Sequence, residues 1–159
     1  MGFGHYHRRV KTVIQRVTRA AVRVDDEVVG EIERGVVALV GVERGDGIAD
    51  AHATARKLAG LRMFPGDKPM DRSLAEIGGG ALVISQFTLA ADLRKGRRPS
   101  FNDAEDPAKA EPLYLAVVDE LRTLGIFCAT GRFGASMAVE LINDGPVTLI
   151  LSSKAGLVT

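Results

Sequence analysis

The feature that most constrains the fold is an uninterrupted apolar run at residues 36–42, Val-Val-Ala-Leu-Val-Gly-Val. β-Branched residues dominate the run and it has no polar face, which is typical of a strand that is buried on both sides. The Arg34-Gly35 pair before it predicts a turn that leads into the strand. A second apolar run at residues 81–85 predicts another strand of the same kind.

Weaker patterns predict the remaining elements. Short apolar or alternating segments predict strands at residues 13–17, 21–24, 27–32, 137–143 and 147–151. Helical spacing of apolar residues predicts one helix that begins at Ile48, with Asp46 as its N-cap. A second helix is expected to begin near residues 106–107 or at Pro112 and to end at Gly125. Residues 73–77 predict a turn or a short helix.

Length and composition indicate one globular domain. The chain has 159 residues, of which 46% are hydrophobic, which excludes a disordered protein. It contains no stretch near the roughly 20 apolar residues that cross a membrane. The lone Cys128 lies between apolar neighbours and is expected to be buried. We expect the domain to span residues 10–153, with residues 1–9 as an N-terminal extension or a cloning remnant and residues 154–159 as a loose tail.

The charge is balanced overall and concentrated locally. A formal net charge of +1 gives no global attraction for nucleic acid. Four cations nevertheless fall within five residues: Arg94, Lys95, Arg97 and Arg98. They form either a solvated loop or a clamp for backbone phosphates, and a footprint of this size suits the end of an RNA better than a long duplex.

Side chains for acid–base chemistry are scarce. His52 lies in the first predicted helix, and the other two histidines lie in the excluded residues 1–9. The sequence has no zinc-ligand spacing, no Gly-x-Ser-x-Gly elbow and no phosphate-binding loop. A hydrolase with this sequence would therefore rely on substrate positioning and on backbone groups.

Two short segments border the predicted strands, namely Ser-Gln-Phe-Thr-Leu at residues 85–89 and Asn-Asp-Gly-Pro-Val-Thr at residues 143–148. Each alone is compatible with an ordinary strand or turn. Further landmarks lie at residues 13–17, 61–64, 95–101, 111–114 and 130–137. In this order and spacing, the segments resemble the D-aminoacyl-tRNA deacylase family.

The resemblance implies both a fold and an activity. The implied fold is α+β, a single domain with barrel-like antiparallel or mixed β-sheets flanked by two main helices, assembled as a homodimer. The implied enzyme is cytoplasmic and hydrolyses the ester between a D-amino acid and the 3′ end of tRNA, with no metal, cofactor or membrane involved. The alternative is a non-catalytic RNA-binding or ligand-binding module on the same scaffold.

The resemblance places catalysis at Ser85, Gln86, Phe87 and Thr88. We expect the backbone N–H groups of Phe87 and Thr88 to stabilise the oxyanion, Ser85 and Gln86 to shape the pocket, and the 2′-hydroxyl of the RNA to assist the attacking water. A nucleophilic Thr88 is the alternative, although it needs a neighbouring base. Strand alternation predicts that the Phe87 ring lies in the core.

The resemblance assigns chiral selection to Gly145 and Pro146, supported by Phe133, Ala135 and Met137. From the residues alone, Gly-Pro predicts an ordinary trans turn. In the family this bond is cis, and it reaches from one subunit into the pocket of its partner. The carbonyls there exclude an L side chain, so glycyl-tRNA is expected as a second substrate.

Overall fold

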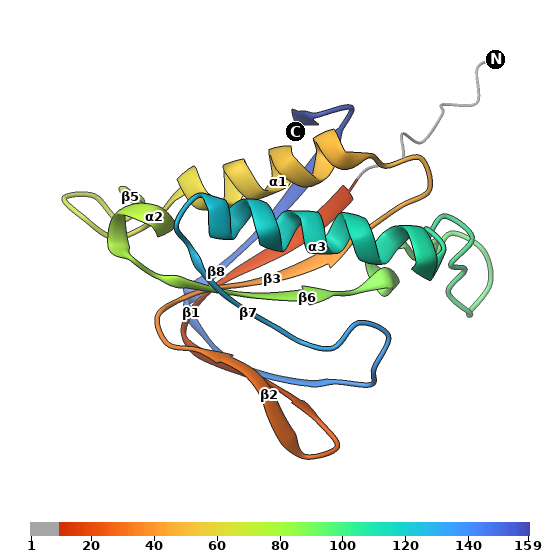
Figure 1. Cartoon of the computed structure of the whole chain (residues 1–159), viewed down its shortest axis with the longest axis horizontal. Helices are drawn as coiled ribbons and strands as arrows, with labels where there is room; N and C mark the ends of the chain where they lie inside the picture. The colour runs from red at the N-terminus through yellow and green to blue at the C-terminus, as the bar shows by residue number, and fades with distance from the viewer. Residues whose placement is uncertain (1–9) are drawn as a thin grey trace.

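The computed structural model describes residues 10–159, and the extension expected at residues 1–9 lies outside the described residues. A 7-stranded sheet has the order β7-β6-β3-β1-β8-β9, with β2 paired to β1 off that path (Figure 1). Its strands are β1 (Val10–Val24), β2 (Glu27–Ile32), β3 (Gly35–Gly41), β6 (Gly80–Ser85), β7 (Phe127–Thr130), β8 (Ala138–Lys154) and β9 (Leu157–Val158). The pair β4 (Arg62–Phe64) and β5 (Arg72–Ser73) forms a separate small sheet.

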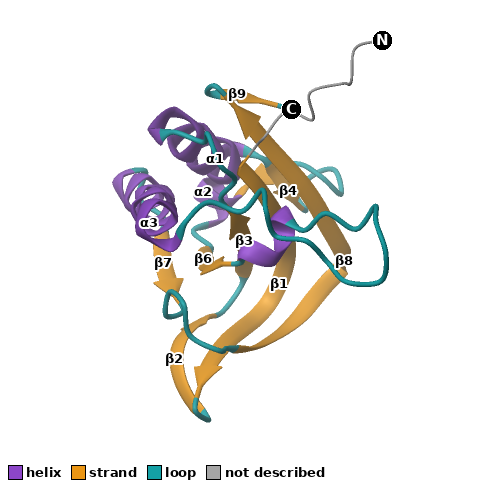
Figure 2. Cartoon of the chain, turned by 90° about the vertical axis from the view of Figure 1, so that its right-hand side faces the viewer, coloured by secondary structure: helices purple, strands orange, loops and turns teal. Residues whose placement is uncertain are grey.

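The sheet is mixed and curled. The strand β3 runs parallel to β6, which runs parallel to β7, whereas the other pairs are antiparallel. Helices α1 (Ile48–Gly60) and α3 (Pro107–Thr123) lie along one face of the sheet (Figures 1 and 2). The expected α+β class, with barrel-like sheets and two main helices, is confirmed as a curled half-barrel.

The core fills the space between the helices and the sheet. The predicted central strand β3 is confirmed, and six of its seven residues are buried. The largest fully buried side chains between helices and sheet are Phe64, Ile14, Leu58, Met63, Leu74 and Leu121. A second cluster covers part of the opposite face and contains Val17, Ala20, Val22, Ile32, Val37, Leu82 and Ile84. No helix within residues 10–159 is long and apolar enough to cross a membrane.

Two strands are longer than the sequence pattern predicted. The segments expected at residues 13–17 and 21–24 form the single strand β1, and those at residues 137–143 and 147–151 form the single strand β8. The pairing between β1 and β8 shifts register between Gln15 and Val17 and again between Val17 and Ala20. Such bulges interrupt side-chain alternation without ending a strand, which explains why the pattern suggested breaks.

The helix ends differ from the prediction in detail. Helix α1 begins at Ile48 as predicted, but its N-cap is Gly47, whose N–H donates to the Asp50 carboxylate at 3.0 Å. Asp46 instead accepts a hydrogen bond from the backbone N–H of Glu43. Helix α3 begins at Pro107, the first of the predicted starts. The short helix α2 (Leu74–Ile77) is confirmed, with Ser73 as its N-cap.

The prediction of a loose tail after Ser153 is wrong. Strands β8 and β9 pair as a hairpin, and the backbone of Ser152 and Thr159 exchanges hydrogen bonds. The buried carboxylate of Asp50 accepts hydrogen bonds from the Ser153 hydroxyl at 3.1 Å and the Gly156 N–H at 3.0 Å. This long-range contact joins the end of the chain to the first turn of α1, which no local pattern could reveal.

We expect Asp46 to make folding pH-dependent. Burial raises its pKa from 3.8 to about 7, with smaller contributions from the carboxylates of Asp50, Glu43 and Glu105. The native state holds a proton between these pH values that the unfolded chain releases, so the free energy of unfolding falls as pH rises through this window and levels off above it. Asp46→Asn keeps an acceptor for the Glu43 N–H and should stabilise the protein at pH 8 by about 1 kcal/mol, after allowance for solvent screening.

Urea unfolding at pH 5 and pH 8 tests this expectation. The variant should show a smaller difference between the two pH values than the wild type. An identical pH dependence in both proteins would contradict the role of Asp46.

Candidate active site

The segment at residues 85–89 lies where the sheet ends. Ser85 is the last residue of β6, and the Gln86 N–H donates to the Val40 carbonyl at 2.8 Å, which extends the pairing with β3 by one bond. The chain then turns into the 3-10 helix η1 (Phe87–Ala90) above Gly41. A Cβ at Gly41 would lie 2.8 Å from the Leu89 Cβ, so only glycine allows this close approach.

The first amides of η1 are the free polar groups of this segment. Within residues 10–159, neither the Phe87 N–H nor the Thr88 N–H donates a hydrogen bond. In a 3-10 helix these leading amides have no acceptor inside the helix. Both residues are exposed. Their sequence-predicted role as donors to an oxyanion is compatible with this geometry.

The Thr88 hydroxyl makes no hydrogen bond in the described chain to a group that could act as a base. It accepts a hydrogen bond from the Gln86 side-chain amide at 3.0 Å, and an amide N–H cannot take a proton from it. The carboxylate nearest in sequence is Asp92, which accepts hydrogen bonds from Nε and Nη2 of Arg94 at 2.9 and 2.7 Å. Hydrogen bonds from Arg94 hold the pKa of Asp92 well below its usual range, which makes it a poor base.

The prediction that the Phe87 ring lies in the core is wrong. The side chain is 58% exposed because Phe87 begins η1 and does not continue the alternation of β6. Its ring meets the Phe101 ring edge to face, with centroids 5.2 Å apart. The backbones of Asp92 and Ser100 exchange two hydrogen bonds, of 2.7 and 3.0 Å. These contacts hold the loop at residues 92–101 against η1.

That loop carries the predicted cationic cluster. Arg94, Lys95, Arg97 and Arg98 are all exposed. Arg94 is engaged by Asp92, whereas Lys95, Arg97 and Arg98 make no ion pair within the described chain. Three unneutralised cations therefore lie on the loop that contacts η1. Arg94 is therefore occupied by Asp92, whereas the other three cations can bind an anionic ligand.

The residues 144–147 form a bulge that leaves the sheet. Asn143 pairs with Val17 and Thr148 pairs with Gln15, so these four residues of β8 lie opposite the single residue Arg16 of β1. The segment does not reverse the chain, and the expectation of a simple turn there is wrong. Gly145 has a φ of +129° and the Gly145–Pro146 peptide bond is cis. Both residues are exposed.

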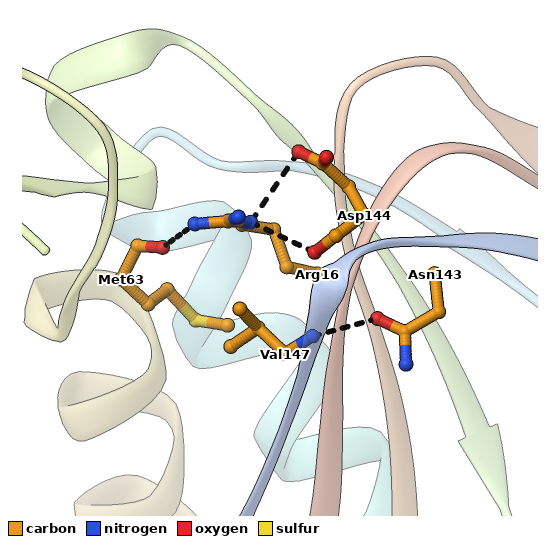
Figure 3. A network of polar contacts seen from close by, with 5 residues as sticks. All are labelled: Arg16, Met63, Asn143, Asp144 and Val147. Carbon is orange, nitrogen blue, oxygen red and sulfur yellow. Dashed lines mark hydrogen bonds and ion pairs between the residues drawn. The ribbon is translucent and has the colours of Figure 1, made fainter. Parts of the chain in front are cut away.

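Arg16 supports the bulge from the buried side (Figure 3). Its guanidinium donates to the Asp144 carbonyl at 3.1 Å and to the Met63 carbonyl at 2.8 Å, and it lies 3.4 Å from the Asp144 carboxylate. This role of Arg16 was not predicted from the sequence. The alternation of buried residues along β1, which includes Thr12 and Ile14, places Arg16 on the buried face and could have indicated it.

The loop between β7 and β8 carries Phe133, Ala135 and Met137. Its start is fixed by β7, in which Thr130 pairs with Val83 of β6, two residues before Ser85. Phe133 packs on the main core, with its ring 6.1 Å from that of Tyr114, whereas Met137 packs on the second cluster. All three residues are half-buried.

The structure does not bring the two predicted segments together in one chain. Ser85 is level with Val40, whereas the bulge lies opposite Arg16, which is level with Val36. Four residues along a strand correspond to roughly 13 Å, and the step from β6 across β3 and β1 to β8 corresponds to roughly 14 Å. Ser85 and the bulge are therefore not adjacent in the sheet of one chain. Among residues 10–159, no cluster of His, Cys, Asp and Glu has a geometry that could hold a metal ion.

Comparisons with known proteins agree on the family. The model of the family described as D-Tyr-tRNA(Tyr) deacylase matches residues 13–152. The D-aminoacyl-tRNA deacylase of Roseiflexus sp. (strain RS-1) is 53% identical over 91% of this chain and 94% of its own. That of Methylococcus capsulatus is 55% identical over 87% and 92%.

Solved structures support the same fold. A c-Myc DNA unwinding element binding protein superimposes with a TM-score of 0.85 and 37% identity, over 91% of this chain and 99% of its own. A probable eukaryotic D-amino acid tRNA deacylase superimposes with a TM-score of 0.79 over 91% and 100%, and its 16% identity supports the fold alone. Together with the family match over residues 13–152, these likenesses show that the chain belongs to the D-Tyr-tRNA(Tyr) deacylase family.

Proposed function

We propose that this protein hydrolyses the ester that joins a D-amino acid to the 3′ end of tRNA, and also cleaves glycyl-tRNA, in the cytoplasm. Relatives at about half identity over most of the chain are named for this activity. The observation that carries the proposal for this chain is the pair of unengaged amides of the exposed residues Phe87 and Thr88, next to a loop with three unneutralised cations.

The reaction needs little from side chains. Water attacks the ester carbonyl, the tetrahedral intermediate carries an oxyanion, and the bond to the ribose 3′ oxygen breaks as that oxygen takes a proton. The two amides of η1 stabilise the oxyanion. The Gln86 side chain, which is hydrogen-bonded to the Thr88 hydroxyl, borders the pocket. The 2′-hydroxyl of the terminal ribose assists the attacking water. Orientation then supplies much of the remaining acceleration.

The pocket is proposed to form between two subunits of a homodimer. Gly145 and Pro146 of one chain would enter the pocket at η1 of the other, because the bulge and Ser85 are not adjacent in the sheet of one chain. Carbonyls of this bulge would then occupy the space of an L side chain and leave room for a D side chain or for glycine. Phe133, Ala135 and Met137 would line the neighbouring wall.

The dimer itself is a testable expectation. Light scattering at assay concentration should give twice the mass of the 16.9 kDa chain. A monomer with full activity at that concentration would contradict a site shared between subunits.

Incubation with D-tyrosyl-tRNA and L-tyrosyl-tRNA tests the function directly. We expect rapid hydrolysis of the D ester. The L ester should be hydrolysed no faster than it is in buffer without the protein. Binding of tRNA without loss of either ester would favour the rival, a non-catalytic RNA-binding or ligand-binding module. The relative named as a DNA unwinding element binding protein makes that rival worth including.

We expect Arg97 and Arg98 to bind phosphates of the tRNA end. Reversal of both charges to Glu should raise the KM for D-tyrosyl-tRNA and reduce the slope of log KM against log salt by about 0.7 for each lost contact. The ratio of D to L cleavage should not change, because phosphate contacts do not read the amino acid.

A matched control reverses Lys57 in α1 and Lys109 in α3, two exposed lysines without an ion pair in the described chain, which changes the net charge equally on other elements. The control should leave the salt slope near its wild-type value. Equal slopes for both double variants and the wild type would rule out the phosphate contacts.

A further inference from the structure

The bulge at residues 144–147 lacks the support that holds a regular strand. Only Arg16 lies opposite it on β1, so the backbone ladder between β1 and β8 is interrupted over this stretch. Gly145 and Pro146 are exposed. Within the bulge, Arg16 contacts Asp144 alone, and it does so from the buried side. A segment that selects by excluding atoms must nevertheless keep its position to within a fraction of an ångström.

On the other side of the bulge, side-chain hydrogen bonds take the place of the interrupted backbone pairing. The Asn143 carboxamide oxygen accepts a hydrogen bond from the Val147 N–H at 3.1 Å (Figure 3), and its NH₂ group donates to the Thr148 hydroxyl at 3.0 Å. Gln15 of β1 donates to the same Thr148 hydroxyl at 3.3 Å. The two ends of the bulge are thereby joined to each other and to β1.

The Thr148 hydroxyl is the point where these contacts meet. A hydroxyl oxygen has two acceptor sites, and Asn143 and Gln15 occupy both of them. Thr148 is exposed and contributes nothing to the buried core, so its hydroxyl is not needed for packing. Its contacts bear only on the geometry of the bulge.

We propose that Thr148, held by Asn143 and Gln15, is a positioning residue that fixes Gly145 and Pro146 for chiral selection. This inference rests on the proposed function, because it names what sets the stereochemical choice of that site. The hydrogen bonds of these three side chains go to one another and to the Val147 N–H, and none of them goes to η1 or to the cationic loop in the described chain. Loss of the hydroxyl should therefore let the bulge move and admit L side chains, while cleavage of the D ester continues.

The test compares Thr148→Val, which keeps the shape and removes the acceptor, with Thr148→Ser, which keeps the hydroxyl. Single-turnover rates on D-tyrosyl-tRNA and L-tyrosyl-tRNA are measured for each variant, together with the melting temperature. In Thr148→Val the ratio of L to D cleavage should rise at least tenfold, with D cleavage within about threefold of the wild type. Thr148→Ser should keep the wild-type ratio, and Gln15→Leu should show a smaller rise.

The outcomes separate the two proposals. A wild-type protein that cleaves neither ester would reject the proposed function and this inference with it. A wild type that discriminates, with an unchanged ratio in Thr148→Val or an equal loss on both esters, would reject the positioning role alone.

Discussion

Phe87→Pro is expected to lower the single-turnover rate on D-tyrosyl-tRNA by about 100- to 1,000-fold, because it removes one donor to the oxyanion. Proline deletes the backbone N–H and leaves the rest of η1 in place. Phe87 is the first residue of that helix, where the fixed φ of proline is tolerated and no hydrogen bond is lost. The preceding Gln86 has φ −140° and ψ 90°, an extended conformation that suits a residue before proline.

Two controls separate the amide from the side chains. Phe87→Ala removes the ring contact with Phe101 and keeps the N–H, so it should retain most activity. Thr88→Ala should also retain substantial activity, because its backbone and not its hydroxyl is assigned to catalysis. A fall of several orders of magnitude in Thr88→Ala with tRNA binding intact would instead favour a threonine nucleophile. Equal rates for Phe87→Pro and Phe87→Ala would contradict the oxyanion role.

Hydrophobic pattern predicted the elements whose own residues carry a clear apolar signal. The continuous apolar run gave β3, and helical spacing located α1 and α3 within a residue or two of their first turns. The short edge strand β7 was not predicted, because it has four residues and begins with an exposed Phe127. Strand β9 depends on a hairpin with β8 and on Asp50, which lies 106 residues from Gly156.

Only part of the candidate site could be predicted from the sequence. The two motifs were found through family resemblance, and their residues alone allowed an ordinary strand and turn. The contacts of Arg16 with Met63 and Asp144 span 47 and 128 residues, and those of Gln15 with Thr148 span 133. No periodicity within a short window carries such information. The exposure of Phe87 was misjudged because a 3-10 helix follows β6 directly.

Removal of the terminal 2′-hydroxyl of the tRNA is expected to lower the single-turnover rate about as much as Phe87→Pro does. General acid–base assistance contributes about 100- to 10,000-fold to such reactions. The described chain has no evident group to supply it at η1, since the Thr88 hydroxyl contacts an amide and Asp92 is neutralised by Arg94. A D-tyrosyl ester on a tRNA that ends in 2′-deoxyadenosine should therefore be cleaved at least 100-fold more slowly than the ribose form.

Binding and chemistry must be measured separately for this substrate. The affinity of the deoxy tRNA should stay close to that of the ribose form, because the cations of the loop are proposed to contact phosphates and not the terminal hydroxyl. Single-turnover rates at saturating enzyme then report the chemical step alone. Undiminished cleavage of the deoxy ester would mean that the protein supplies its own base, and a carboxylate or imidazole outside η1 would have to reach the ester.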